Sequence, residues 1–328
     1  MKITNVSNVQ VAQEDNVKEQ FALDVLTGLC STPKNISAKY FYDDKGSELF
    51  QKITSHKDYY PTRTEFEILD SIKDELPKVV GEKEIDLVEL GAGDGHKTEL
   101  VIQGFLNAGV IVNFYPIDIS EKAMHLLKKN ITAHKNLKIH GIVAEYFQGL
   151  RYARTLSTNK QIVLVLGSNI GNFNPAQSQG FLRQLRKTIN KSDYALIGFD
   201  LKKNIDTLLS AYNDSAGITR DFNLNLLNRM NQELDANFDV SSFEHFGTYN
   251  PILGAMESYL ISKKDQTVFI GELERTFEFN EMEAIHLEYS FKFLKKDINF
   301  LCEHSAFEVV EHFSDKNDYF VDTLWKAI

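Results

Sequence analysis

Apolar residues in the middle of the chain follow two patterns that alternate with each other. Short apolar runs typical of buried strands are followed by stretches in which apolar residues recur every three or four positions, as on one face of a helix. Strands separated by helices of about 10–15 residues form βαβ units and lie parallel. Residues 62–200 are therefore expected to form an α/β domain with a doubly wound parallel sheet. The strand-type runs are 85–91, 112–120, 137–147, 161–168 and 194–201.

The pattern before and after this region is different. Residues 15–30 predict a helix, and another should begin near Thr62, because Tyr60 precedes a proline and such residues favour extended backbone. Residues 203–260 indicate a helix-rich segment with one apolar stripe. The stripe consists of Phe222, Leu226, Leu227, Met230 and Leu234, and strand patterns return at 266–280, 284–294 and 307–328.

These changes of pattern predict two domains that are not consecutive halves of the 328 residues. Residues 61–198 and 286–328 would form the doubly wound domain, in which the C-terminal hairpin adds an antiparallel strand to a parallel sheet. Residues 1–60 and 199–285 would form a second lobe.

Composition and charge exclude several classes of partner. The 46 acidic residues outnumber the 36 basic ones, and the net charge of −10 disfavours nucleic acid and anionic membranes. No apolar run approaches the roughly 20 residues of a membrane span, and the N-terminus lacks the apolar stretch of a signal peptide. Cys30 and Cys302 belong to no metal-binding motif, and the histidines show no metal-ligand spacing. We expect a cytoplasmic monomer that binds a small molecule and no metal.

A glycine-rich loop follows the first strand of the predicted sheet, in the segment VELGAGDGHKT at 88–98. Its GxGxG spacing differs from the GxGxxG of dinucleotide folds, and Glu89 and Asp94 would repel a pyrophosphate. S-adenosylmethionine carries a sulfonium and an ammonium group and no phosphate, so acidic residues favour it. The loop therefore predicts S-adenosylmethionine as co-substrate, bound by Glu89, Gly91 and Gly93.

Two later strand ends carry further candidates for the same site. Asp118 ends the second strand, where a carboxylate can accept hydrogen bonds from ribose hydroxyls, although an Asp there can also be a helix cap or turn residue. Glu145 and Tyr146 follow the third strand, where a polar and aromatic pair could contact adenine or simply begin a helix.

Three longer stretches, 40–69, 165–175 and 198–245, contain unusual motifs such as YYPTRTE, GSNIGN and AYND. In the same order and over nearly the whole chain, they closely resemble the L-histidine Nα-methyltransferase family of ergothioneine biosynthesis. That family makes hercynine, the trimethylated betaine of histidine, from histidine and three molecules of S-adenosylmethionine. The resemblance implies a class I methyltransferase domain and a substrate lobe, with the active site in the cleft between them.

The resemblance also implies roles for individual residues. Tyr42 would lie near the substrate amine and Tyr59 would contact the imidazole. Asn172 and Tyr212 would hold the α-carboxylate and orient the amine, so Tyr42 and Asn172 are the candidate catalytic residues. The imidazole nitrogens would bind Glu288 and Ser290, and the positions that match the donor site are Gly91, Lys97, Asp118, Glu145 and Tyr146.

Each of these residues has a plainer interpretation without the resemblance. Tyr42 and Tyr59 could be aromatics at the edge of a core, and Asn172 could be a turn residue before Pro175. Strict alternation would place His286, Glu288, Ser290 and Lys292 together on one strand face, which by default faces water.

One departure affects the choice of substrate. Histidine enzymes of this family often read Glu-Met-Trp-Leu where this chain has Glu257, Ser258, Tyr259 and Leu260, so Ser258 stands where a methionine packs on the imidazole. The expected activity is trimethylation of the α-amino group of L-histidine. The alternatives are the same chemistry on tryptophan or tyrosine, and a protein that binds S-adenosylmethionine without turnover.

Overall fold

The computed structural model describes residues 1–6, 14–119 and 121–328, which form two compact units. Unit 1 contains Pro61–Lys202 and Lys292–Ile328 together with residues 1–6. Unit 2 contains residues 14–60 and Lys203–Phe291. Residues 7–13, which belong to the predicted second lobe, and residue 120, the last of a predicted strand, lie outside the described residues.

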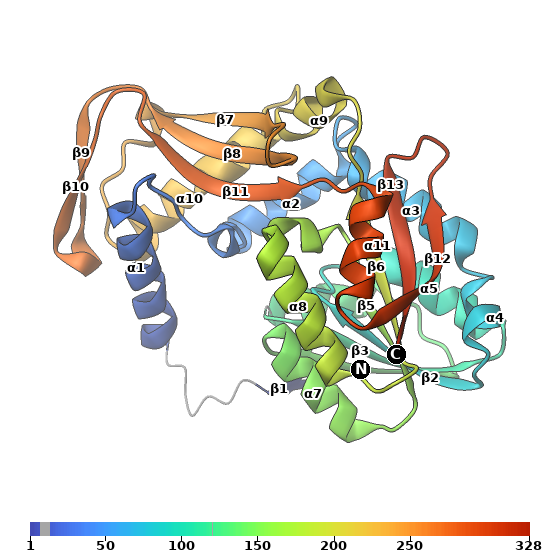
Figure 1. Ribbon diagram of the computed structural model, residues 1–328. Helices are drawn as coiled ribbons and strands as arrows, with labels where there is room; N and C mark the ends of the chain where they lie inside the picture. The colour runs from blue at the N-terminus through green and yellow to red at the C-terminus, as the bar shows by residue number, and fades with distance from the viewer. Residues whose placement is uncertain (7–13, 120) are drawn as a thin grey trace. The chain divides into compact units, whose positions relative to one another are not determined.

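Among its described residues, unit 1 contains an eight-stranded sheet in the order β1-β4-β3-β2-β5-β6-β13-β12 (Figure 1). The first six of these strands are parallel to one another, whereas β13 is antiparallel to both β6 and β12. The α/β doubly wound class and the antiparallel C-terminal hairpin are thus confirmed. The strands are β1 (Lys2–Asn5), β2 (Glu84–Leu90), β3 (Ile111–Asp118), β4 (Leu137–Val143), β5 (Lys160–Val165), β6 (Tyr194–Asp200), β12 (Phe307–Ser314) and β13 (Phe320–Ala327).

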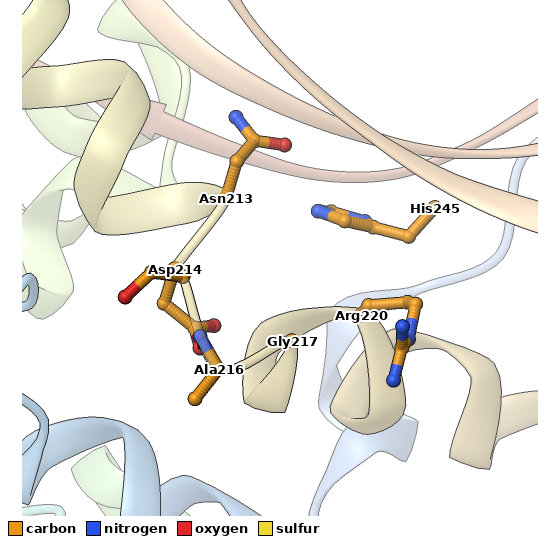
Figure 2. A pocket seen from close by; sticks show the side chains of 7 residues that line it. Asn213, Asp214, Ala216, Gly217, Arg220 and His245 are labelled. Carbon is orange, nitrogen blue, oxygen red and sulfur yellow. The ribbon is translucent and has the colours of Figure 1, made fainter.

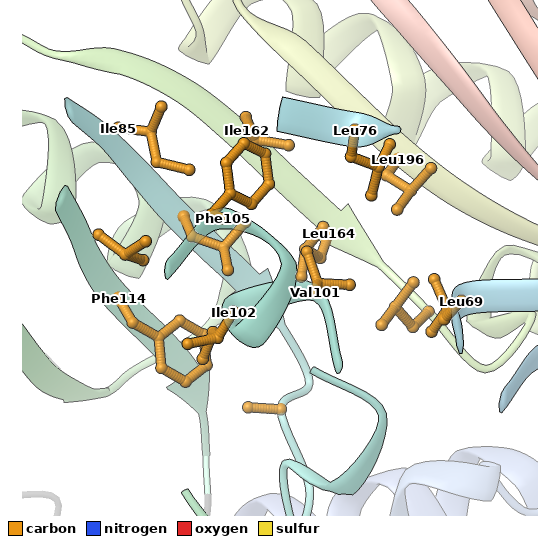
Figure 3. Close-up of a cluster of buried hydrophobic side chains, with 14 of the residues drawn as sticks. Leu69, Leu76, Ile85, Val101, Ile102, Phe105, Phe114, Ile162, Leu164 and Leu196 are labelled. Atoms are coloured by element: carbon orange, nitrogen blue, oxygen red, sulfur yellow. The ribbon is translucent and has the colours of Figure 1, made fainter. Parts of the chain in front are cut away.

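Helices cover both faces of this sheet. On one face, apolar side chains of α3 to α6 share a core with β2, β3, β5 and β6, including Phe105 and Phe114 (Figure 3). On the other face, α7 lies close to β3, because a Cβ on Gly149 would stand 2.6 Å from Ile117. The helices of unit 1 are α3 (Tyr60–Ile72), α4 (Leu76–Val80), α5 (His96–Asn107), α6 (Glu121–Asn130), α7 (Tyr146–Leu156), α8 (Pro175–Thr188) and α11 (Lys295–Glu303).

The short strand β1 is a finding that the sequence pattern did not predict. It pairs in parallel with β4, from Lys2 opposite His140 to Asn5 opposite Val143. Residues 2–5 therefore belong to the large sheet, whereas the sequence placed them in the second lobe. Four residues are too few to show a period of two, so only their partner strand reveals them.

Unit 2 contains a three-stranded antiparallel sheet in the order β11-β8-β7 and a hairpin of β9 and β10. The predicted apolar stripe on α10 is buried against this sheet, together with side chains of α1 and α2. The elements are α1 (Glu14–Cys30), α2 (Asp44–Ser55), α9 (Ile205–Tyr212), α10 (Ile218–Glu233), β7 (Phe243–Asn250), β8 (Ala255–Ser262), β9 (Gln266–Ile270), β10 (Arg275–Phe279) and β11 (Ala284–Phe291).

The helix-rich prediction for residues 203–260 is correct only as far as Glu233, because β7 and most of β8 follow within it. Nearly every residue of β8 is buried, so that strand shows no alternation of apolar and polar positions. The helix predicted to begin near Thr62 begins two residues earlier, at Tyr60.

A β-bulge in β11 corrects the predicted faces of that strand. The register with β8 shifts between His286, which lies opposite Tyr259, and Glu288, which lies opposite Ser258. Residues opposite each other share a face, and neighbours along β8 do not, so His286 and Glu288 point to opposite faces. His286 instead packs against Tyr289 in a tilted arrangement, with ring centroids 4.1 Å apart. Simple alternation is therefore wrong for His286.

Candidate functional site

The glycine loop joins β2 to α5 and adopts backbone angles that favour glycine. Gly91, Gly93 and Gly95 have φ values of 76°, 51° and 74°. A Cβ on Gly91 would lie 2.9 Å from the Tyr146 hydroxyl, so glycine permits that close approach, whereas a Cβ on Gly93 would meet no atom within 4 Å. The loop thus provides an open cradle in which a ligand can approach the backbone closely.

Glu89 lies at the end of β2, just before this loop, and is 4% exposed. Thr98 donates a hydrogen bond of 2.6 Å to its Oε1, whereas its Oε2 is buried without a hydrogen-bond partner. Burial raises the pKa of Glu89 to about 8, although Thr98 and Lys97 lower it. A buried carboxyl group with an unused acceptor oxygen fits a cationic ligand group, such as the ammonium of S-adenosylmethionine.

Asp118, Glu145 and Tyr146 lie at the carboxyl ends of the neighbouring strands β3 and β4. The Gly93 amide faces Asp118, with 3.4 Å between the nitrogen and Oδ2. Burial, with smaller contributions from Asp118 and Glu145, raises the pKa of Tyr146 to about 12, so the phenol keeps its proton near neutral pH. Because parallel strands end at the same sheet edge, these residues lie at the edge that carries the glycine loop.

Lys97, in the first turn of α5, pairs with the buried carboxylate of Glu65 from α3. Glu65 also accepts hydrogen bonds of 2.7 and 3.0 Å from the backbone amide of Gly167. Lys97 is therefore held by a carboxylate that also anchors the turn after β5.

Asn172 ends a short 3-10 helix, Asn169–Asn172, in that same turn of unit 1. The turn is tight, because Gly167 and Ser168 have φ values of 77° and 56°. Asn172 is exposed, and the capping box that begins α8 two residues later belongs to Asn174. The plainer interpretation of Asn172 as a residue of this turn is thus correct for its backbone, and its side chain is available for binding.

In unit 2, the predicted substrate residues gather on one face of the three-stranded sheet. The Tyr212 hydroxyl, at the end of α9, donates a 2.7 Å hydrogen bond to Ser290 on β11. Ser258 on β8 lies opposite Glu288 in the register. Ser258 and Ser290 are 3% and 7% exposed, so this face of β11 is covered and does not face water.

The two predicted tyrosines from the N-terminal part differ in their surroundings. The Tyr59 ring lies 6.5 Å from the Tyr212 ring at a steep angle, so it belongs to the same group. Tyr42 is 44% exposed and packs edge-on against Phe50 and Phe222, at 5.5 and 5.8 Å. Tyr42 thus has the surroundings of an aromatic at the edge of a core.

A pocket of about 350 Å³ lies next to α9 and is lined by residues 213–217, Arg220 and His245 (Figure 2). Its lining contains none of the residues that the sequence predicted for the site, but it begins directly after Tyr212. Asp214 accepts hydrogen bonds from the amides of Ile218 and Thr219, so the start of α10 is already capped.

A family model described as "Histidine-specific methyltransferase, SAM-dependent" matches residues 21–327. The chain belongs to this family. This confirms the resemblance, the class of enzyme and the use of S-adenosylmethionine as methyl donor.

Relatives of this chain have names that refer to more than one compound. A histidine N-alpha-methyltransferase from Mycolicibacterium smegmatis is 34% identical, over 87% of this chain and 88% of that protein. The ergothioneine biosynthesis protein 1 of Neurospora crassa is 28% identical, over 90% of this chain and 33% of its own length. A 4-dimethylallyltryptophan N-methyltransferase from Claviceps fusiformis is 24% identical, over 85% of this chain and 83% of that protein.

In this methyltransferase, the residues that sequence reasoning missed are mainly supporting ones. Glu65, the last residue of the TRTE motif, and Thr98 hold the predicted residues Lys97 and Glu89. The motif itself was a usable signal for Glu65. No group of three or more potential metal ligands occurs among the described residues, and no described helix is long and apolar enough to cross a membrane.

Proposed function

We propose that this enzyme trimethylates the α-amino group of L-histidine to give hercynine. The observation that carries the proposal is the set of Tyr212, Ser290 and Glu288 on one sheet face, in a chain of the histidine-specific family. A carboxylate and two hydroxyls offer partners for both imidazole nitrogens and for the amino-acid backbone. Glu288 would accept an imidazole N–H, which ligands without that donor cannot replace.

Each unit would have its own task. Unit 1 would bind S-adenosylmethionine, with Glu89 toward its ammonium, Asp118 toward its ribose and Tyr146 toward its adenine. The open glycine cradle and the unused oxygen of Glu89 support this assignment. The other proposed contacts with S-adenosylmethionine are Gly91, Gly93, Lys97 and Glu145.

Unit 2 would bind the amino acid through Tyr59, Tyr212, Glu288 and Ser290, with Ser258 beneath the ring in place of a methionine. Asn172 and Tyr42 would orient the amine.

The reaction is an in-line displacement, in which the amine nitrogen forms a bond to the methyl carbon as the bond from sulfur to carbon breaks. Catalysis then depends mainly on alignment and on exclusion of water. The nucleophile must be the neutral amine, and the nearby sulfonium lowers the amine pKa. We propose that Asn172 and the Tyr42 phenol aim the lone pair at the methyl group. Each round transfers one methyl group, releases one proton and leaves S-adenosylhomocysteine.

Incubation with S-adenosylmethionine and a pool of the twenty amino acids tests the substrate directly. Mass spectrometry should show histidine gaining three methyl groups. Trimethylated tryptophan or tyrosine would instead establish the alternative, which the Claviceps relative and the small Ser258 favour. No product with any amino acid, combined with tight donor binding, would indicate a protein without turnover.

We further propose that the enzyme acts as a monomer, without a metal, in a reducing compartment such as the cytoplasm. The unpaired thiols of Cys30 and Cys302 support a reducing compartment. Light scattering at several protein concentrations tests the oligomeric state.

A further inference from the structure

We propose that His245 and Asn213 are positioning residues that hold Tyr212 against Ser290. The inference rests on the proposed function, in which Tyr212 binds the amino-acid substrate. It concerns two residues that line the pocket beside α9 (Figure 2). His245 lies on β7 and contacts the Tyr212 carbonyl, whereas Asn213 directly follows Tyr212 and contacts Gly247 of β7.

His245 fixes the backbone of Tyr212. Its Nε2 lies 2.9 Å from the Tyr212 carbonyl oxygen, and its Nδ1 lies 2.7 Å from the side-chain nitrogen of Asn223. A carbonyl oxygen can only accept, so Nε2 carries the proton and Nδ1 accepts from the Asn223 amide. Asn223 is 1% exposed, and burial lowers the pKa of His245, which favours the neutral ring. The imidazole thus donates one well-defined hydrogen bond to Tyr212.

Asn213 fixes the next residue to the free edge of the sheet. β7 is an edge strand, whose outward backbone groups need partners. The Asn213 side chain accepts from the Gly247 amide at 3.1 Å and donates to the Gly247 carbonyl at 3.0 Å. It thereby takes the place of a neighbouring strand. A Cβ on Gly247 would lie 2.9 Å from Asn213 and 3.0 Å from the Tyr212 carbonyl, so glycine permits this close approach.

These contacts hold the end of α9 at both edges of the sheet. Gly247 lies opposite Ser258, which lies opposite Glu288, so one row of residues crosses all three strands. The backbone of α9 is held at the β7 edge, and the Tyr212 hydroxyl reaches Ser290 on β11 at the other edge. Tyr212 is therefore held over the row that contains Ser258 and Glu288. Loss of either anchor should let the phenol move away from the substrate groups.

The experiment compares His245→Ala and Asn213→Ala with Asn231→Ala. Asn231 is a matched control in the same unit, since its side chain also bonds both backbone groups of one residue, Phe238, at 2.8 and 2.9 Å. His245→Ala and Asn213→Ala should raise the KM for histidine by about three- to tenfold, the effect of one or two net hydrogen bonds. The Kd for S-adenosylhomocysteine should change less than about twofold in all three. Asn231→Ala should leave the KM for histidine unchanged.

Two further variants separate positioning from general destabilisation. His245→Gln can still donate from its side-chain amide and should restore most of the KM, whereas loss of packing alone would not be restored. In a Tyr212→Phe background, His245→Ala should cause little further loss, because it acts through Tyr212. Equal KM values for Asn213→Ala, His245→Ala and the control would overturn the inference, as would fully additive losses in the Tyr212→Phe background.

The outcomes also separate this inference from the proposed function. A wild-type protein that methylates another amino acid refutes the histidine assignment, and the same KM comparison is then made with that amino acid. A wild-type protein that methylates histidine, with unaffected variants, refutes only the positioning role. If Asn213→Ala does not fold, the pair His245→Ala and His245→Gln decides.

Discussion

Glu89 combines a cost in stability with a proposed role in donor binding. Its pKa is about 8 in the folded protein, against 4.5 for an exposed glutamate. Between these values the folded protein keeps the proton and the unfolded chain does not, so unfolding releases a proton and stability falls as pH rises. Below a pH of about 4.5, Glu89 is protonated in both the folded and the unfolded protein, so its ionisation no longer lowers the stability of the fold.

Glu89→Gln should therefore be more stable than the wild type at about pH 8, and the difference should shrink at about pH 5. The variant should also bind S-adenosylhomocysteine more weakly, because an amide attracts the donor ammonium less than a carboxylate does. Urea unfolding at both pH values, with calorimetric titration of the ligand, checks both effects. A stability difference that does not depend on pH would show that Glu89 ionises normally.

Asn172 is the residue whose substitution best tests the catalytic assignment. Asn172→Ala should lower kcat about a hundredfold, a magnitude typical for removal of one aligned polar group, while donor affinity stays within about twofold. Single-turnover methylation and ligand titration measure the two effects. Asn174→Ala is the matched control, since that side chain caps α8 and its loss should reduce stability by about 1 kcal/mol without affecting methylation. Loss of donor binding in Asn172→Ala would contradict the assignment.

Glu288 should determine which amino acid is accepted. Glu288→Ala removes the proposed imidazole acceptor and should weaken histidine kcat/KM by about a hundredfold, while larger apolar amino acids are accepted better. Competition between histidine and tryptophan, followed by mass spectrometry, measures the ratio. Glu257→Ala is the control, because Glu257 lies next along β8 to Ser258 and thus on the opposite face. Unchanged histidine kinetics in Glu288→Ala would refute the specificity role.

At the scale of elements, one buried carboxylate connects three parts of unit 1. Glu65 of α3 pairs with Lys97 of α5 and accepts from Gly167 after β5. It also explains Gly198 on β6, since a Cβ there would lie 2.4 Å from the Glu65 carboxylate. Asp322 on β13, opposite Gly198, is fully buried, and burial and Glu65 raise its pKa well above the usual value. The Lys97 ammonium thus faces two acidic groups, and the raised pKa of Asp322 favours the neutral form of that carboxyl group.

Glu65→Gln should destabilise unit 1 by about 3–5 kcal/mol, because it leaves the Lys97 ammonium largely buried without its counter-ion. Glu65→Gln combined with Lys97→Met should be less destabilised than the sum of the two single variants, since no buried charge is left alone. Chemical unfolding of the three variants measures this coupling. Asp322→Asn should remain near wild-type stability, because an amide can replace a protonated acid. Full additivity of Glu65→Gln and Lys97→Met would refute the pairing.

Elements with a strong local pattern could be predicted from the sequence, and elements defined by their partners could not. The apolar runs of β2, β5 and β6 and the stripe on α10 were correctly predicted, because burial selects their residues directly. The bulge in β11 could not be predicted, since it depends on the register with β8. His245 was missed because its partner is a backbone carbonyl 33 positions away. Every residue has a backbone carbonyl, so no residue type in the sequence indicates this contact.

For the whole molecule, the division into two units suggests how the ligands divide between them. The net charge of −10 is spread over the chain, but the proposed donor contacts Glu89, Asp118 and Tyr146 all lie in unit 1. The proposed histidine contacts Tyr212, Glu288 and Ser290 lie in unit 2. Ligand binding slows amide exchange by stabilising the native state locally, so each ligand should protect its own segments.

Hydrogen exchange with mass spectrometry tests this division in the full-length protein. S-adenosylhomocysteine alone should protect the peptides that contain 88–98 and 144–150 and leave 205–213 and 284–291 unchanged. Histidine added to that complex should then protect 205–213 and 284–291. The His245→Ala variant is the internal control, because it should lose only the histidine-dependent protection of 205–213. Protection of both unit 2 segments by S-adenosylhomocysteine alone would mean that the donor binds there as well, and the assignment of separate tasks to the two units would then be wrong.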